Sequence, residues 1–293
     1  MNQGPQFLGI GAQKAATTWL EHCLRQHPEI WLPPRKELHY FDDQADGLRA
    51  GRLVFGSSSA VRRMRRELVP RIRSGIRFLN RKELHWDLSY FFGRRTDAWY
   101  LALFPCHSGS VSGEITPAYS ILDEAAIAHV HSLLPDVKLI FLMRDPIDRS
   151  WSQIRMDLAR IPRKICDLSL EEMITLAHSD TVALRSDYHR TLRNWGRHYA
   201  ADRFFIRFLE DVRDEPQRLL QDLFDFLGVD PSENIAADLL GRRVHASRDN
   251  QEIPPELERE LARFHLGTIR ELESRFGGHA VAWRERAERL IAG

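Results

Sequence analysis

The sequence has few of the residues that mark disulfide-rich, zinc-binding and membrane proteins. Its 293 residues include three cysteines, Cys23, Cys106 and Cys166, with no C-x-x-C pair, so neither a disulfide framework nor a zinc ribbon is supported. No apolar run approaches the roughly 18 residues of a membrane helix, and the first residues lack the basic start of a secretory signal. We therefore expect free thiols, a cytoplasmic location and no membrane anchor.

Excess charge of one sign is also missing. The 42 basic and 41 acidic residues give a formal net charge of +1 at pH 7. Nucleic-acid-binding proteins usually carry a large basic excess, so we expect no nucleic-acid partner. The 13 histidines are scattered and H-E-x-x-H is absent, so no metal is expected. The 15 Phe, 7 Trp and 6 Tyr provide enough core material to exclude disorder.

Short apolar segments alternate with amphipathic ones along the chain. Strands are expected at 7–10, 137–143 and 204–209, and 111–120 carries turn residues after a strand-like run. Helices are expected at 17–24, 98–104, 123–134 and 216–227, after Asp145-Pro146, and as a packing helix over 256–290. This alternation predicts an α/β fold in one domain over 1–293, with a central, mostly parallel sheet flanked by helices.

The first strand leads into a loop of small residues, 11–16, and then into a helix that starts at Thr17. The N–H groups and the dipole at a helix start favour an anion, and Lys14, Thr17 and Thr18 add a charge and two hydroxyl donors. A nucleotide triphosphatase P-loop has Lys directly before Ser/Thr, whereas Lys14 precedes Thr17 by three residues. This spacing weakens a kinase or ATPase interpretation, and taken alone the loop could be an ordinary strand–helix turn.

Three segments resemble one family. The loop GAQKAATTWL (11–20) resembles the K-x-G-T-T phosphosulfate-binding loop of sulfotransferases that use 3′-phosphoadenosine 5′-phosphosulfate (PAPS), with Ala16 at the usual glycine. Residues 36–42, KELHYFD, resemble the K-E-x-H-F-F segment of the glycan sulfotransferases. Residues 138–153 resemble the 3′-phosphate-binding segment, because Arg144 and Ser152 have its spacing of eight. The resemblance runs from residue 7 to about 277 and implies a P-loop-kinase-like sulfotransferase fold.

The resemblance implies in-line transfer of a sulfuryl group from PAPS to an acceptor hydroxyl or amine, releasing 3′,5′-adenosine bisphosphate (PAP), without a metal. Lys14 would stabilise the leaving 5′-phosphate, and Arg144 with Ser152 would hold the 3′-phosphate. Trp19 would stack on adenine. The donor contacts implied are Gln13, Lys14, Ala15, Ala16, Thr17, Thr18, Trp19, Arg144, Ser152 and Arg248, the last from a weakly matching basic loop at 244–248.

On the acceptor side the resemblance makes Glu37 the general base, with His39 orienting the acceptor or assisting. The two share a face if the segment is extended, whereas Lys36 would then point the other way. A surface ion pair for Glu37 and a packing role for His39 are the alternatives. Residues 113–119, GEITPAY, resemble the family's E-K-[ST]-P-x-Y segment with Ile115 in place of its lysine, so we expect Glu114 and Tyr119 to face the acceptor.

The sequence leaves the acceptor open. A carbohydrate hydroxyl is favoured by the 36–42 segment, and a lipid, a small alcohol and a peptide tyrosine remain alternatives. Six arginines at 62–73 form either a solvated face or a docking surface for an anionic acceptor such as a glycan. A non-catalytic anion- or glycan-binding protein is the competing function, and the oligomeric state stays open.

Overall fold

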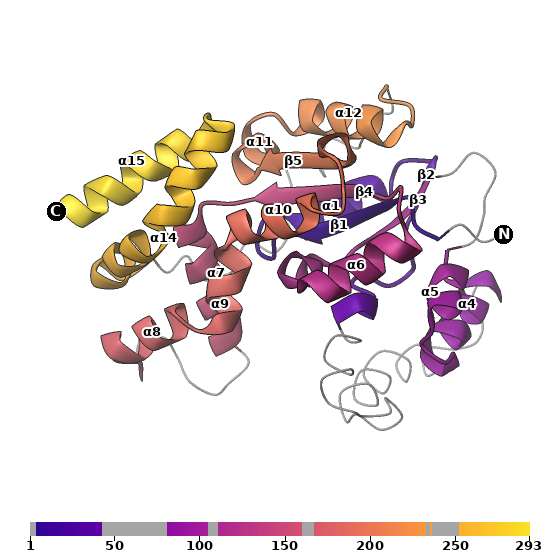
Figure 1. Ribbon diagram of the computed structural model, residues 1–293, viewed down its shortest axis with the longest axis horizontal. Helices are drawn as coiled ribbons and strands as arrows, with labels where there is room; N and C mark the ends of the chain where they lie inside the picture. The colour runs from indigo at the N-terminus through magenta and orange to yellow at the C-terminus, as the bar shows by residue number, and fades with distance from the viewer. Residues whose placement is uncertain (1–3, 43–80, 105–110, 160–166, 233–234, 236–251) are drawn as a thin grey trace.

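A computed structural model describes residues 4–42, 81–104, 111–159, 167–232, 235 and 252–293 (Figure 1). Its core is a five-stranded sheet in the order β2-β3-β1-β4-β5. The strands are β1 (Phe7–Gly11), β2 (Ile30–Trp31), β3 (Val111–Ile115), β4 (Lys138–Met143) and β5 (Phe204–Phe208). Every pairing between these strands is parallel, so the expected α/β fold is confirmed.

The central strands are apolar because both of their faces are covered. All five residues of β1 and five of the six in β4 are buried. Gly9 of β1 lies opposite Ile115 and Ile140 in the two neighbouring strands. A Cβ at Gly9 would come within 2.8 Å of the Ile115 side chain, so close packing of β1 against β3 requires glycine there.

Helices lie on both sides of the sheet (Figure 1). They are α1 (Thr17–Leu24), α4 (Arg81–Phe92), α5 (Asp97–Ala102), η2 (Pro117–Ile121), α6 (Glu124–Leu133), α7 (Pro146–Leu158), α8 (Leu170–Ala177), α9 (Asp180–Ser186), α10 (Tyr188–Gly196), η4 (Ala201–Arg203), α11 (Leu209–Asp214), α12 (Pro216–Leu227), α14 (Pro255–Phe276) and α15 (His279–Ala292). Two of these helices have well-formed ends: Asp145 caps the start of α7 by accepting from the Ile147 N–H, and Gly228 ends α12 with φ of 81°.

Three elements differ from expectation. β3 occupies 111–115, where turn residues led us to expect a turn, and the two-residue strand β2 was not expected at all. A single helix was expected over 256–290, but the structure has two, α14 and α15, which form a hairpin. The chain turns between them at Gly277 and Gly278, which adopt φ of 59° and 52°. The basic stretch 62–73 and the loop with Arg248 lie outside the described residues.

The carboxyl ends of β1, β4 and β5 meet at one edge of the parallel sheet, where ligands of α/β proteins bind. The hairpin of α14 and α15 lies at the opposite end of the molecule from α4 and α5 (Figure 1). Within the described ranges, no helix combines the length and apolarity needed to cross a bilayer.

Candidate active site

The loop between β1 and α1 leaves the start of the helix open to an anion. Ala16 is the N-cap of α1, and it has no side-chain oxygen to accept from the first N–H groups. The first turn also contains no acidic residue. Lys14 and Thr18 are partly exposed on this loop, while Thr17 and Ala15 are buried. The helix start therefore presents N–H donors, one hydroxyl and one ammonium group to an anionic ligand.

Two residues of this loop adopt left-handed backbone conformations. The φ angles are 73° at Lys14 and 59° at Ala16. The family has glycine at position 16, and the structure shows why: the conformation suits a residue without Cβ. The alanine is therefore accommodated with strain.

Replacing Ala16 by Gly is expected to raise the free energy of unfolding by about 0.5 kcal/mol. Relief of the left-handed strain raises the free energy of unfolding by roughly 1 kcal/mol. The greater conformational entropy of glycine in the unfolded chain lowers it by about 0.5 kcal/mol. Denaturant unfolding measures the change. Ala15→Gly is the matched control, because Ala15 is fully buried and not left-handed, and it should lose stability. Equal losses in both variants would contradict the strain at Ala16.

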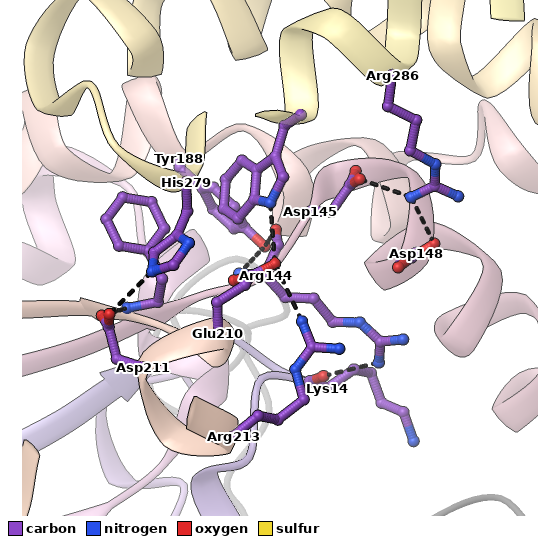
Figure 2. A network of polar contacts seen from close by, with 12 residues as sticks. Lys14, Arg144, Asp145, Asp148, Tyr188, Glu210, Asp211, Arg213, His279 and Arg286 are labelled. Atoms are coloured by element: carbon purple, nitrogen blue, oxygen red, sulfur yellow. Dashed lines mark hydrogen bonds and ion pairs between the residues drawn. The ribbon is translucent and has the colours of Figure 1, made fainter. Parts of the chain in front are cut away.

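Arg144 follows β4, and its side chain extends to the loop between β1 and α1, residues 11–16, which we call the donor loop (Figure 2). Its Nη1 donates to the carbonyl oxygen of Lys14 at 3.2 Å, and its own carbonyl accepts from the Tyr188 hydroxyl at 2.9 Å. Burial is the main cause that lowers the pKa of its guanidinium, and its Nε is buried with no hydrogen-bond partner among the described residues. Arg144 is thus held beside Lys14 with a donor group still to satisfy.

The other expected donor residues divide into two groups. Ser152 lies in the second turn of α7 and is 9% exposed, and the Gln13 Oε1 is buried without a partner in the described structure. Trp19 is different, because it packs in the core with 3% of its surface exposed. Stacking on adenine needs an accessible ring face, so the expected role of Trp19 is not supported.

The segment that carries Glu37 is folded back on itself rather than extended. Glu37 and His39 both have left-handed φ angles, 59° and 53°. Their side chains still meet, with His39 Nε2 3.3 Å from Glu37 Oε2 and His39 Nδ1 2.6 Å from Asp42 Oδ2. Burial disfavours the imidazolium, but its hydrogen bonds to Asp42 and Glu37 outweigh this and raise the pKa of His39 to about 9. His39 is therefore protonated at neutral pH and donates to both carboxylates.

Lys36 joins this group, which the sequence did not suggest. Its Nζ donates to Thr18 Oγ1 at 2.7 Å and lies 3.8 Å from Glu37 and 3.9 Å from Glu21. The expectation that Lys36 points away from Glu37 is wrong, because it assumed an extended chain. The turn at Glu37 brings Lys36 back to α1, so one ammonium group connects the donor loop to the carboxylate.

Glu37 is partly exposed and ionised. Burial raises the pKa of its carboxyl group, but the hydrogen bond from His39 and the charge of Lys36 lower it more, so it lies below its usual value. The side chain is 35% exposed, which leaves the carboxylate accessible to an acceptor. An ionised and accessible carboxylate can accept a proton, and because its pKa is lowered Glu37 is a weaker base than an unpaired glutamate.

Glu114 and Tyr119 do not face an acceptor, which corrects the expectation from the sequence. Both are buried, at 2% and 0% exposure. Glu114 accepts hydrogen bonds from the hydroxyls of Tyr100 at 2.6 Å, Thr116 at 2.7 Å and Tyr119 at 3.0 Å. The Tyr119 hydroxyl in turn accepts from the Tyr40 N–H at 3.1 Å. This buried network supports the backbone that follows Glu37.

The residues present fit a donor that carries anionic groups. Hydrogen-bond donors for an anion come from the uncapped helix start, the Lys14 ammonium, the Thr18 hydroxyl and the Arg144 Nε, which has no partner within the described part of the chain. In the described part of the chain, no group of three or more His, Cys, Asp or Glu side chains is arranged to hold a metal ion.

Comparison with known proteins identifies the family of this chain. Residues 5–233 match the model of the sulfotransferase family. Heparan sulfate glucosamine 3-O-sulfotransferase 6 of Mus musculus is 30% identical over 200 residues, which cover 62% of this chain and 57% of that protein. The chain therefore matches less than two thirds of the length of this curated relative.

Solved structures share the fold. A sulfotransferase from Alicyclobacillus acidocaldarius superposes with a TM-score of 0.62 at 22% identity, covering 96% of this chain and 98% of that one. The sulfotransferase domain of the Synechococcus PCC 7002 olefin synthase has a TM-score of 0.55 at 20% identity, covering 92% and 94%. Because the family model matches well over half of the residues, this chain belongs to the sulfotransferase family.

Proposed function

We propose that this protein transfers a sulfuryl group from PAPS to an acceptor hydroxyl or amine. The observation that carries the proposal is the link made by Lys36, whose ammonium lies 2.7 Å from Thr18 in the donor loop and 3.8 Å from Glu37. Transfer between two substrates requires an anion site and a base at adjacent positions, and Lys36 spans them.

The residues divide the chemistry as follows. Glu37 takes the proton of the acceptor as its oxygen or nitrogen bonds to sulfur, while the bond from sulfur to the 5′-phosphate oxygen breaks. Lys14 and the N–H groups of α1 neutralise the charge that develops on the departing phosphate. Arg144 and Ser152 hold the 3′-phosphate. His39, fixed between Glu37 and Asp42, orients the base.

A carbohydrate is the acceptor class that we favour. The curated relative named above is a heparan sulfate enzyme, and the 36–42 segment resembles that of glycan sulfotransferases. Ile115 replaces the lysine of those enzymes, and its side chain is 2% exposed and packs against Gly9. No cation can come from position 115, and Lys36 is a cation beside the same base.

Calorimetric titration with PAP tests the donor site. We expect PAP to bind more tightly than ATP or 5′-AMP, and Arg144→Ala to weaken PAP binding by about thirtyfold through loss of a charge-assisted hydrogen bond. Arg197→Ala is a control, because Arg197 is an exposed arginine whose partner is Glu124. A preference for ATP, or equal affinity for PAP and 5′-AMP, would overturn the proposal.

A further inference from the structure

A second arginine points toward Arg144 from the other side of the site. Arg213 lies on α11, which follows β5, and in the view of Figure 2 its guanidinium is drawn next to that of Arg144; an interaction between the two charges agrees with this placement. The two charges interact. Burial is the largest cause that lowers the pKa of Arg144, and the positive charge of Arg213 lowers it further. Two like charges repel each other, and an anion placed between them offsets that repulsion by attracting both.

Contacts with Glu210 and the C-terminal hairpin hold Arg213 in position. Its Nη2 lies 3.3 Å from Glu210 Oε1, and the same oxygen accepts from the indole N–H of Trp283 in α15 at 3.0 Å. The neighbouring Asp211 lies 3.0 Å from His279 Nε2 and accepts from the Phe208 N–H at 2.8 Å. The C-terminal hairpin thus orders the turn that presents Arg213. Trp283 and His279 lie beyond residues 5–233, which match the family.

Arg213 also remains available. Its side chain is 59% exposed, and among the described residues Glu210 is the one carboxylate within 4 Å of its guanidinium. Glu210 is itself 17% exposed, so its charge faces the protein and the indole of Trp283. The outer side of the guanidinium is free to bind a dianion while its inner side stays paired with Glu210.

We propose that Arg213 is a further ligand of the 3′-phosphate of the donor, and that Arg144 and Arg213 bind this phosphate from two sides. A 3′-phosphate dianion between the two guanidiniums removes their repulsion and accepts hydrogen bonds from both. The proposal rests on the proposed function, because it assumes that Arg144 binds the 3′-phosphate. The residue pair predicts a ligand with a terminal phosphate rather than a neutral ribose at this place.

The test is the affinity of Arg213→Gln for PAP and for 5′-AMP, measured by calorimetry. We expect PAP binding to weaken by about tenfold and 5′-AMP binding to stay unchanged, because 5′-AMP lacks the 3′-phosphate. The dependence of PAP affinity on salt should also become less steep, since one cation is lost. Arg213→Lys should recover part of the affinity.

Arg218→Gln is the matched control. Arg218 also pairs with a glutamate three residues before it, Glu215 at 3.2 Å, and is 74% exposed. It should bind PAP like the parent protein. Unchanged PAP affinity in Arg213→Gln, with binding lost in Arg144→Ala, would overturn the role of Arg213 and leave the proposed function standing. A parent protein that does not prefer PAP to 5′-AMP would overturn both.

Discussion

Replacing Glu37 by Gln should lower kcat by about a thousandfold, which is the middle of the range for loss of a general base. Glutamine keeps the size of the side chain and can still accept from His39 and Lys36, but it cannot take a proton from the acceptor. PAP affinity should change by less than about threefold, because Lys36, and not Glu37, donates to Thr18 of the donor loop. Sulfate transfer from PAPS and PAP calorimetry provide the two readouts.

Two variants control this experiment. Glu215→Gln removes an exposed carboxylate that pairs with Arg218, and its activity should be unchanged. Glu37→Asp keeps the base but shortens it by one methylene, so part of the activity should return. Turnover of Glu37→Gln at the parent rate would show that another group accepts the proton. His39 could not do so in its resting state, because a pKa of about 9 keeps it protonated at neutral pH.

The donor half of the site could be predicted from the sequence because its parts are local. A buried strand, a loop of small residues and a helix start fix where N–H groups point, so the place of the loop at 11–16 follows from local sequence, whereas the assignment of an anion to it depends on the family resemblance. Arg144 is similar, since it directly follows β4 and precedes the Asp145-Pro146 helix start. Neighbours in sequence determine these positions.

The acceptor half could not be predicted in the same way because its contacts depend on backbone turns and distant residues. The positive φ angles at Glu37 and His39 bring Lys36 toward Thr18, and period-two reasoning assumes that no such turn occurs. Glu114 carries an ordinary acidic side chain in sequence, and only the packing of Tyr100 and Tyr119 around it shows that it is buried. Resemblance named this residue but not its environment.

Replacing Arg286 by Gln should lower the free energy of unfolding by about 3 kcal/mol at pH 8, the scale expected when one partner of a buried pair is removed. Arg286 Nη1 lies 2.6 Å from Asp145 and 2.9 Å from Asp148 (Figure 2). Its Nη2 donates to Glu258 at 2.6 Å. The Asp145 side chain is 5% exposed, so without Arg286 its charge has little access to water.

The loss should be smaller at pH 5 than at pH 8. Burial, with the neighbouring charge of Asp148, raises the pKa of Asp145 to about 6 despite Arg286, above its usual 3.8. An acid with a raised folded-state pKa contributes stability that is fully present below 3.8 and is lost as the pH rises through about 6. At pH 5 much of Asp145 is already protonated and needs Arg286 less, whereas at pH 8 it is ionised and depends on it.

Urea unfolding at both pH values, combined with Asp145→Asn, measures this coupling. Asparagine keeps the N-cap of α7 but removes the buried charge, so Arg286→Gln should cost less in that background and lose most of its pH dependence. Arg284→Gln is the control on the same helix, because its partners Glu273, Glu285 and Glu288 are 26%, 52% and 38% exposed. It should have a smaller effect without the pH dependence. Equal losses for Arg286→Gln at pH 5 and pH 8 would mean that Asp145 is not the group that Arg286 stabilises, and that Arg286 holds the hairpin to α7 through Asp148 instead.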